Sequence, residues 1–301
     1  MLIFSKMRHI SVKRVVFWTL FIGITSFFLY AHTIELRASS REYITALSND
    51  TTSVKVDRLD YEGKDIRHIL VERGKKTLMV LIHGSPSSSE QWIPLAKDSV
   101  LGSKVDFLMI DRPGYGYSSF GNPILSVKKQ AEITSKIISK LKDKYSKVLL
   151  FGTSYGGTVS SRLLMDYPSL VDGAVLLSSS MAPGEERTYG ISYLIDEVPW
   201  LFPRPIVVAN EEKLSHYDQL KDMEPLWDRI KSKLLFIHST TDDLIYPSNI
   251  QFVLDKLNKK VPWDTVWVEN GEHSLYWSDR EFVKNQLNKF VDSFQPAFLK
   301  D

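Results

Sequence analysis

Short apolar runs alternate with polar and amphipathic stretches over most of the chain. Residues 54–84 alternate between apolar and polar positions like two antiparallel strands, and then become continuously apolar at Leu78–Ile82. Further apolar runs are VDFLMID, VLLFG, AVLLSS, KLLFIHS and TVWVENG, and most are separated by stretches of helical periodicity such as 126–145 and 155–167. Strand and helix in alternation predict an α/β fold with a mostly parallel sheet, covered by helices on both faces.

One segment interrupts this alternation. Residues 181–231 lie between two predicted strands and are rich in proline and aromatic residues. They are too long for a simple crossover, so we interpret them as a cap inserted into a main domain that covers residues 54–301.

The first part of the chain follows a different pattern. Residues 15–34 carry no formal charge and, as a helix, would span roughly 30 Å, the thickness of the hydrocarbon core of a bilayer. The basic residues of 1–14 precede this segment, so the positive-inside rule predicts a cytoplasmic N-terminus, a transmembrane signal anchor at 15–34, a linker at 35–53 and an extracytoplasmic catalytic domain. A cleaved signal peptide, cut near Leu29 and Ala31, is the alternative.

Composition adds two exclusions. The 301 residues include no cysteine, which excludes disulfides, a thiolate nucleophile and thiolate metal ligands. The formal net charge is +2, and four basic residues precede the first acidic residue, Glu35, so the remainder carries a charge of −2. That balance gives no electrostatic reason to expect a nucleic-acid partner.

The stretch FGTSYGG contains the candidate nucleophile. Gly152 to Gly156 fit the pattern G-x-S-x-G, with an apolar run before them and a helical pattern after them. This strand, turn and helix is the context in which a nucleophilic serine is held on a strained turn, so Ser154 is the candidate. The alternative is a serine in an ordinary glycine-rich turn.

A serine nucleophile needs a base, and a histidine in a later loop is required. His273 follows the last predicted strand and precedes the last helix, and we predict it as the base. The other histidines are His9 and His32 beside the apolar segment, His68 in an edge strand, His83 and His238 at strand ends, and His216 in the cap.

The carboxylate that orients the base is expected after the run KLLFIHS, where Asp242 and Asp243 are adjacent. Consecutive side chains point in different directions, so only one of them faces His273. Counting from Ser239 selects Asp242, whereas counting back from Pro247 selects Asp243; we favour Asp242 as the acid.

The oxyanion formed by attack on a carbonyl needs backbone N–H donors that are fixed before the reaction. The amide of Tyr155 is one candidate, because it follows the nucleophile at a helix N-terminus. The second candidate is the amide of Ser85, in the loop HGSPSSS after the apolar strand at residues 78–82.

Together these motifs resemble the α/β-hydrolase superfamily, in its H-G-x-P branch. The resemblance covers residues 54–295 and rests on HGSP at 83–86, DRPGYGYS at 111–118, GTSYG at 152–156, and on Asp242 and His273. It implies a Ser-His-Asp triad on a mostly parallel eight-stranded sheet, with a helical cap after the sixth strand and no metal or organic cofactor. Relatives that hydrolyse epoxides or carbon–halogen bonds use a carboxylate where this chain has Ser154.

The resulting hypothesis is a serine hydrolase that cleaves a carboxylic ester or related acyl bond of a small-molecule substrate, which could be lipid-derived. An acyltransferase with the same triad and a non-catalytic, membrane-tethered binding module are the alternatives. Aromatic residues of the cap and the base loop suggest an apolar acyl pocket or a small core of the cap itself; they are Tyr189, Tyr193, Trp200, Phe202, Tyr217, Trp227, Tyr276 and Trp277.

Overall fold

The computed structural model describes residues 11–31, 33–185 and 187–295. Among them, eight strands form one sheet in the order β1-β2-β4-β3-β5-β6-β7-β8. The strands are β1 Ser53–Tyr61, β2 Lys64–Glu72, β3 Thr77–Ile82, β4 Asp106–Ile110, β5 Lys147–Thr153, β6 Gly173–Leu177, β7 Lys233–Ser239 and β8 Trp263–Val268. β1 and β2 are antiparallel, β2 is antiparallel to β4, and all other neighbours are parallel, which confirms the predicted sheet.

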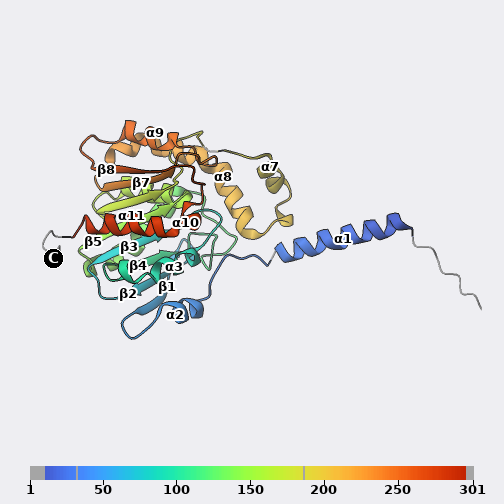
Figure 1. Ribbon diagram of the computed structural model, residues 1–301, viewed down its shortest axis with the longest axis horizontal. Coiled ribbons are helices and arrows are strands. Elements are labelled where there is room, and N and C mark those ends of the chain that lie inside the picture. The colour runs from blue at the N-terminus through green and yellow to red at the C-terminus, as the bar shows by residue number, and fades with distance from the viewer. Residues whose placement is uncertain (1–10, 32, 186, 296–301) are drawn as a thin grey trace, which may run out of the picture.

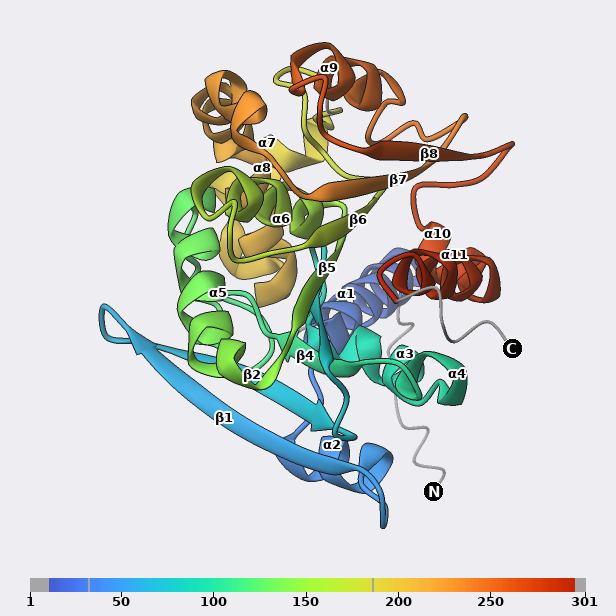
Figure 2. The same ribbon diagram turned by 90° about the vertical axis from the view of Figure 1, so that its left-hand side faces the viewer.

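Helices cover both faces of the sheet (Figure 2). On one face pack α5 Val127–Leu141, α6 Tyr155–Asp166 and α9 Ser248–Lys256; on the other pack α3 Ile93–Ala96, α4 Ser99–Gly102, α10 Leu275–Ser278 and α11 Arg280–Asp292. Short 3-10 turns are η1 Ser89–Trp92 and η2 Lys142–Lys144. Because successive side chains point to opposite faces, a central strand such as β3 supplies Val80 to one core and Leu81 to the other. This double burial explains why the central strands are continuously apolar in sequence.

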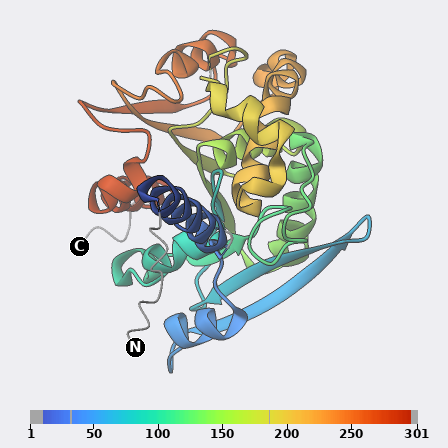
Figure 3. The same cartoon turned by 90° about the vertical axis from the view of Figure 1, so that its right-hand side faces the viewer.

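The insertion between β6 and β7 is helical. It contains α7 Gly190–Glu197, η3 Pro199–Leu201, α8 Arg204–Met223 and η4 Glu224–Arg229, and we call residues 178–232 the cap. The C-terminal part of the cap joins the main core through Leu220, Met223 and Trp227. Its α7 and α8 lie on the side of the domain from which the helix α1, Val12–Ala31, projects (Figures 1 and 3).

The prediction of a membrane anchor at residues 15–34 is wrong. The helix α1 spans Val12–Ala31 and includes Lys13 and Arg14, which leaves about 17 uncharged helical residues, or roughly 25 Å. No helix in the described part of the chain combines the length and apolar character needed to cross a bilayer. The predicted single-pass topology, with an extracytoplasmic catalytic domain, is therefore overturned; residues 1–10 and His32 lie outside the described residues.

Residues 35–53, interpreted above as a linker, include a helix that packs on the domain. The helix α2 spans Ser40–Leu47 and begins with a capping box, in which the Ser39 hydroxyl accepts from the N–H of Glu42 and the Glu42 carboxylate accepts from the N–H of Ser39. Tyr43 and Leu47 on its inner face are buried in the same core as α3. This segment is therefore part of the folded domain.

We predict that Tyr43→Ala lowers the free energy of unfolding by about 3 kcal/mol, because it empties a fully buried aromatic site. Ile44→Ala, on the exposed face of the same helix, should change it by less than about 0.5 kcal/mol. Denaturant unfolding of both variants measures the difference. An effect of Tyr43→Ala on the free energy of unfolding as small as that of Ile44→Ala would show that α2 does not contribute to the core.

Candidate active site

Ser154 lies on the turn between β5 and α6, in a backbone conformation that residues with a side chain rarely adopt. Its φ is 51° and its ψ is −122°. The turn brings α6 close to neighbouring backbone: a Cβ at Gly156 would overlap the carbonyl oxygens of Ile82 and His83, and one at Gly152 would overlap Ser160 and the carbonyl of Gly156. Glycine at these two positions permits the close approach that the strained serine needs.

The structure brings Ser154, His273 and Asp242 together, from three loops at the carboxyl end of the sheet. The His273 Nε2 lies 3.1 Å from the Ser154 Oγ, and the His273 Nδ1 lies 2.8 Å from the Asp242 Oδ2. The backbone N–H groups of Leu244 and Ile245 donate to the other oxygen of Asp242, at 3.0 and 2.9 Å. The carboxylate is thus fixed by its own loop and can orient the imidazole.

The two candidate acids differ sharply in environment. Asp242 is buried and faces His273, whereas the side chain of Asp243 is 79% exposed and lies 3.9 Å from the Arg187 guanidinium. Burial alone would raise the pKa of Asp242, but the hydrogen bond and charge of His273 and the N–H of Ile245 hold it below its usual value. Asp242 is therefore ionised at neutral pH.

The loops that carry His273 and Asp242 are tied to each other at Ser239. This serine closes β7, and its hydroxyl donates to the carbonyl oxygen of Gly271 at 2.6 Å, two residues before His273. His238 lies on the other side, with its Nε2 3.5 Å from the Asp242 Oδ2 and 2.9 Å from the Ile245 carbonyl oxygen. Burial lowers the pKa of His238, so it contributes a neutral ring to this loop.

The two predicted oxyanion donors lie beside Ser154. Tyr155 is the first residue of α6, and Ser85 and Tyr155 line the same cavity as Ser154. A Cβ at Gly84 would stand only 3.1 Å from the Cβ of Ser154, so the loop that carries Ser85 passes directly beside Ser154. This arrangement can present two amides to one oxygen atom.

Hydrogen bonds from Arg112 hold the loop that carries Ser85. Its guanidinium donates to the carbonyl oxygens of His83 and Gly84, at 2.8 and 3.1 Å, and to the Ser85 hydroxyl at 2.6 Å. Its backbone N–H donates to the His83 Nε2 at 3.0 Å. Arg112 and His83 are both buried, so these bonds are shielded from water.

Glu212, on the cap helix α8, is the ion-pair partner of Arg112. Its role at this site was not predicted from the sequence. Its carboxylate is fully buried, pairs with Arg112, and accepts hydrogen bonds from the hydroxyls of Ser85 and Tyr115. Residues 208, 212, 216 and 220 all lie on the buried face of α8. Two of these four residues, Glu212 and His216, are polar, so the sequence shows no apolar stripe that would have marked Glu212 as buried.

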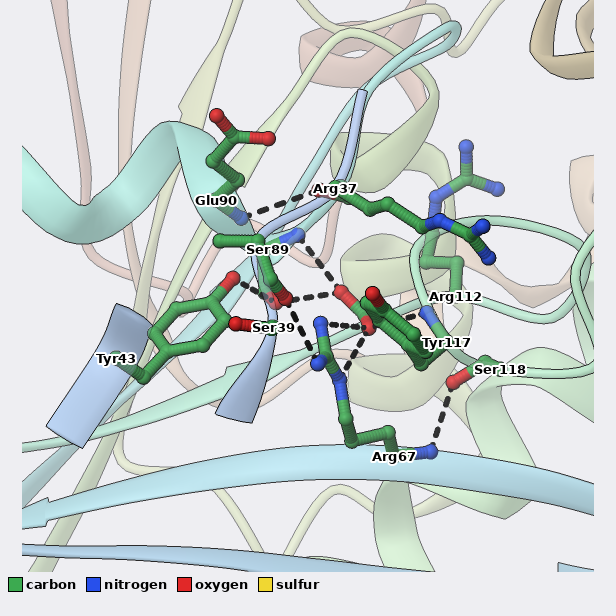
Figure 4. Close-up of polar contacts among 12 residues, drawn as sticks. Arg37, Ser39, Tyr43, Arg67, Ser89, Glu90, Arg112, Tyr117 and Ser118 are labelled. Carbon is green, nitrogen blue, oxygen red and sulfur yellow. Dashed lines mark hydrogen bonds and ion pairs between the residues drawn. The ribbon is translucent and has the colours of Figure 1, made fainter. Parts of the chain in front are cut away.

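Asp111, the residue before Arg112, fixes the far end of the same loop. Its carboxylate accepts from the N–H of Ser89 at 3.0 Å and from the Nε of Arg67 at 2.7 Å. Arg67 and Ser89 converge there with Tyr43 of α2, whose hydroxyl lies 2.7 Å from the Ser89 Oγ (Figure 4). Two consecutive residues therefore hold the two ends of the loop at residues 83–89.

Two cavities meet at Ser154, and both include Ser85. The base-side cavity, of about 180 Å³, is also lined by His273, Tyr276 and Trp277. The cap-side cavity, of about 170 Å³, is also lined by Ser180, Arg187, Tyr189, Lys213, His216 and Ile245.

The predicted aromatic set does not form one pocket. Tyr189 lines the cap-side cavity and Trp227 belongs to the core, while Tyr193, Trp200 and Tyr217 are largely exposed. Among the described residues, no cluster of three or more His, Asp or Glu side chains is suited to hold a metal ion.

Comparison with known proteins places this site in a familiar fold. The model of a family described as having the alpha/beta hydrolase fold matches residues 77–204. Over 105 residues, 35% of this chain, the sequence is 34% identical to a pimeloyl-[acyl-carrier protein] methyl ester esterase of Proteus mirabilis. The match spans 37% of the length of that relative.

Solved structures extend the likeness over most of the chain. A serine hydrolase from Cycloclasticus zankles, 17% identical, covers 83% of this chain and all of its own, with a TM-score of 0.63. An esterase from Exiguobacterium antarcticum, also 17% identical, covers 77% of this chain and 97% of its own, with a TM-score of 0.62. The chain therefore has the α/β-hydrolase fold.

We predict that Glu212→Ala lowers the free energy of unfolding by about 3–5 kcal/mol, because it leaves the buried charge of Arg112 without its partner. Asp218→Ala, at an exposed position of the same helix, should have an effect below about 0.5 kcal/mol. Denaturant unfolding followed by fluorescence and circular dichroism provides the comparison. An effect of Glu212→Ala as small as that of the control would contradict the role given to the ion pair.

Proposed function

We propose that this chain, which has the fold shared by the α/β hydrolases, is a serine hydrolase that cleaves a carboxylic ester or related acyl bond. The observation that carries the proposal is the continuous chain of hydrogen bonds from Ser154 through His273 to Asp242. In this reading Ser154 is the nucleophile, His273 the base and Asp242 the acid that orients the base.

The first half of the reaction forms an acyl-enzyme. The Ser154 Oγ attacks the carbonyl carbon of the ester while the His273 Nε2 takes its proton, and the amides of Ser85 and Tyr155 stabilise the oxyanion. The imidazolium then donates this proton to the alkoxide oxygen, so the alcohol leaves and Ser154 remains acylated.

The second half regenerates the enzyme. A water molecule attacks the acyl carbonyl as His273 takes its proton, and the Ser154 Oγ recovers a proton when the acid product departs. Asp242 keeps its charge throughout, because its role is to hold the imidazole in one tautomer and to stabilise the imidazolium.

Three further observations support an ester substrate. Curated relatives that match part of the chain bear the name of methyl ester esterases. Ser85, in the H-G-x-P loop, lines the same cavity as Ser154. Because residue 154 is a serine and not a carboxylate, acyl chemistry is favoured over hydrolysis of epoxides or carbon–halogen bonds. The two cavities flank Ser154, so one can take the acyl portion and the other the alcohol portion of a small ester.

We predict that Ser154→Ala and Asp242→Asn each lower kcat for a 4-nitrophenyl ester by roughly 10³-fold or more. The first removes the nucleophile, and the second removes the charge that orients and stabilises His273. Asp243→Asn is the matched control, because its carboxylate is exposed and lies 3.9 Å from the Arg187 guanidinium; it should retain near-wild-type kcat.

Steady-state kinetics of the three variants, each confirmed as folded by circular dichroism, makes this test. A loss in Asp243→Asn equal to that in Asp242→Asn would contradict the assignment of the acid. Retained turnover in Ser154→Ala would contradict the proposed function itself.

A further inference from the structure

The cap-side cavity carries positive charge near the proposed nucleophile. Two of its lining residues, Arg187 and Lys213, are cationic, and none of its described lining residues is a carboxylate. Glu212 is adjacent to Lys213 in sequence, but its carboxylate is buried against Arg112 and accepts from Ser85, so its charge is already matched. Arg187 has Asp243 at 3.9 Å, and both side chains are at least half exposed, so this pairing is weak.

The cavity is lined by apolar side chains as well as by the two cationic ones. Ile245 is 6% exposed and Ala209 and Leu244 also line the cavity, whereas the Arg187 side chain is 50% exposed. The positive field also reaches the buried wall: burial lowers the pKa of His216 to about 3, and the charges of Lys213 and Arg112 contribute. His216 therefore remains neutral, and Arg187 and Lys213 supply the charge.

We propose that the cap-side cavity binds an anionic group of the substrate, a carboxylate or a phosphate, several bonds away from the ester that Ser154 attacks. Apolar atoms next to the ester would contact Ile245 and Leu244, and the anion would pair with Arg187 and Lys213. This inference rests on the proposed function, because it names the substrate class of the same site. The shared chemistry is a short chain with a negative charge.

The test compares matched esters whose hydrolysis is followed by proton release. Monomethyl glutarate and methyl 4-phosphonobutanoate carry an anion on the acyl portion, with methyl pentanoate as their neutral match. The anion 3-acetoxypropanoate carries the charge on the alcohol portion, with propyl acetate as its match. We expect kcat/KM to favour at least one anionic ester over its neutral match by roughly five- to tenfold or more.

The cationic residues are then tested by substitution. The double variant Arg187→Gln, Lys213→Gln should lose the preference, because its kcat/KM falls more for the anionic esters than for their neutral matches. Lys221→Gln is the control. This exposed lysine pairs with Glu224 at the C-terminal end of α8 and does not line the cavity. Equal rates for charged and neutral esters in wild type, or a preference that persists in the double variant, would overturn the inference.

Failure of the proposed function is distinguishable from failure of this inference. Calorimetric titration of Ser154→Ala with monomethyl glutarate, methyl 4-phosphonobutanoate, 3-acetoxypropanoate and their neutral matches measures binding without turnover. Stronger binding of an anionic ester, lost in Arg187→Gln, Lys213→Gln on the same background, would support the anion site even if no ester were hydrolysed. Absence of any difference in binding and in rates would overturn the anion site and leave the hydrolase proposal to stand on hydrolysis of the neutral esters.

Discussion

The buried ion pair between Arg112 and Glu212 is the interaction on which the arrangement of the site depends. Removing two charges from water is costly, and the cost is offset here because nearly every donor of the guanidinium has a partner. Those partners belong to the loop at residues 83–89, to the cap helix α8 and, through Gln130, to α5. The same pair therefore fixes the amide of Ser85 and the position of the cap, and a shift in either would leave a buried charge unpaired.

The central sheet supplies the second constraint. Parallel strands bring the loops after β3, β5 and β7 to one edge, where the Ser85 loop, Ser154 and Asp242 meet. The strained backbone of Ser154 persists because Gly152 and Gly156 allow α6 to pack against the end of β3 without a clash. The strain and the close packing are thus two aspects of one turn, and both aim the hydroxyl toward His273.

The sequence predicts the parts of the fold and site that depend on local patterns. Continuous apolar runs identified the central strands, and G-x-S-x-G followed by a helical pattern pointed to Ser154. Glu212 could not be found in this way, because its partner Arg112 is a hundred residues distant and only the folded chain brings them together. The interpretation of residues 15–34 as a membrane anchor and of residues 35–53 as a linker failed for a related reason. Where α1 begins and ends, and whether α2 packs on the core, depend on contacts and helix ends that composition does not reveal.

The measurement that tests the central claim most directly is the intact mass of the full chain after reaction with a fluorophosphonate, followed by peptide mapping. An activated Ser154 predicts a single adduct on the peptide that contains Ser154, and a much slower reaction in His273→Ala. No adduct on folded protein, or an adduct that forms equally fast in His273→Ala, would contradict the claim that His273 activates Ser154.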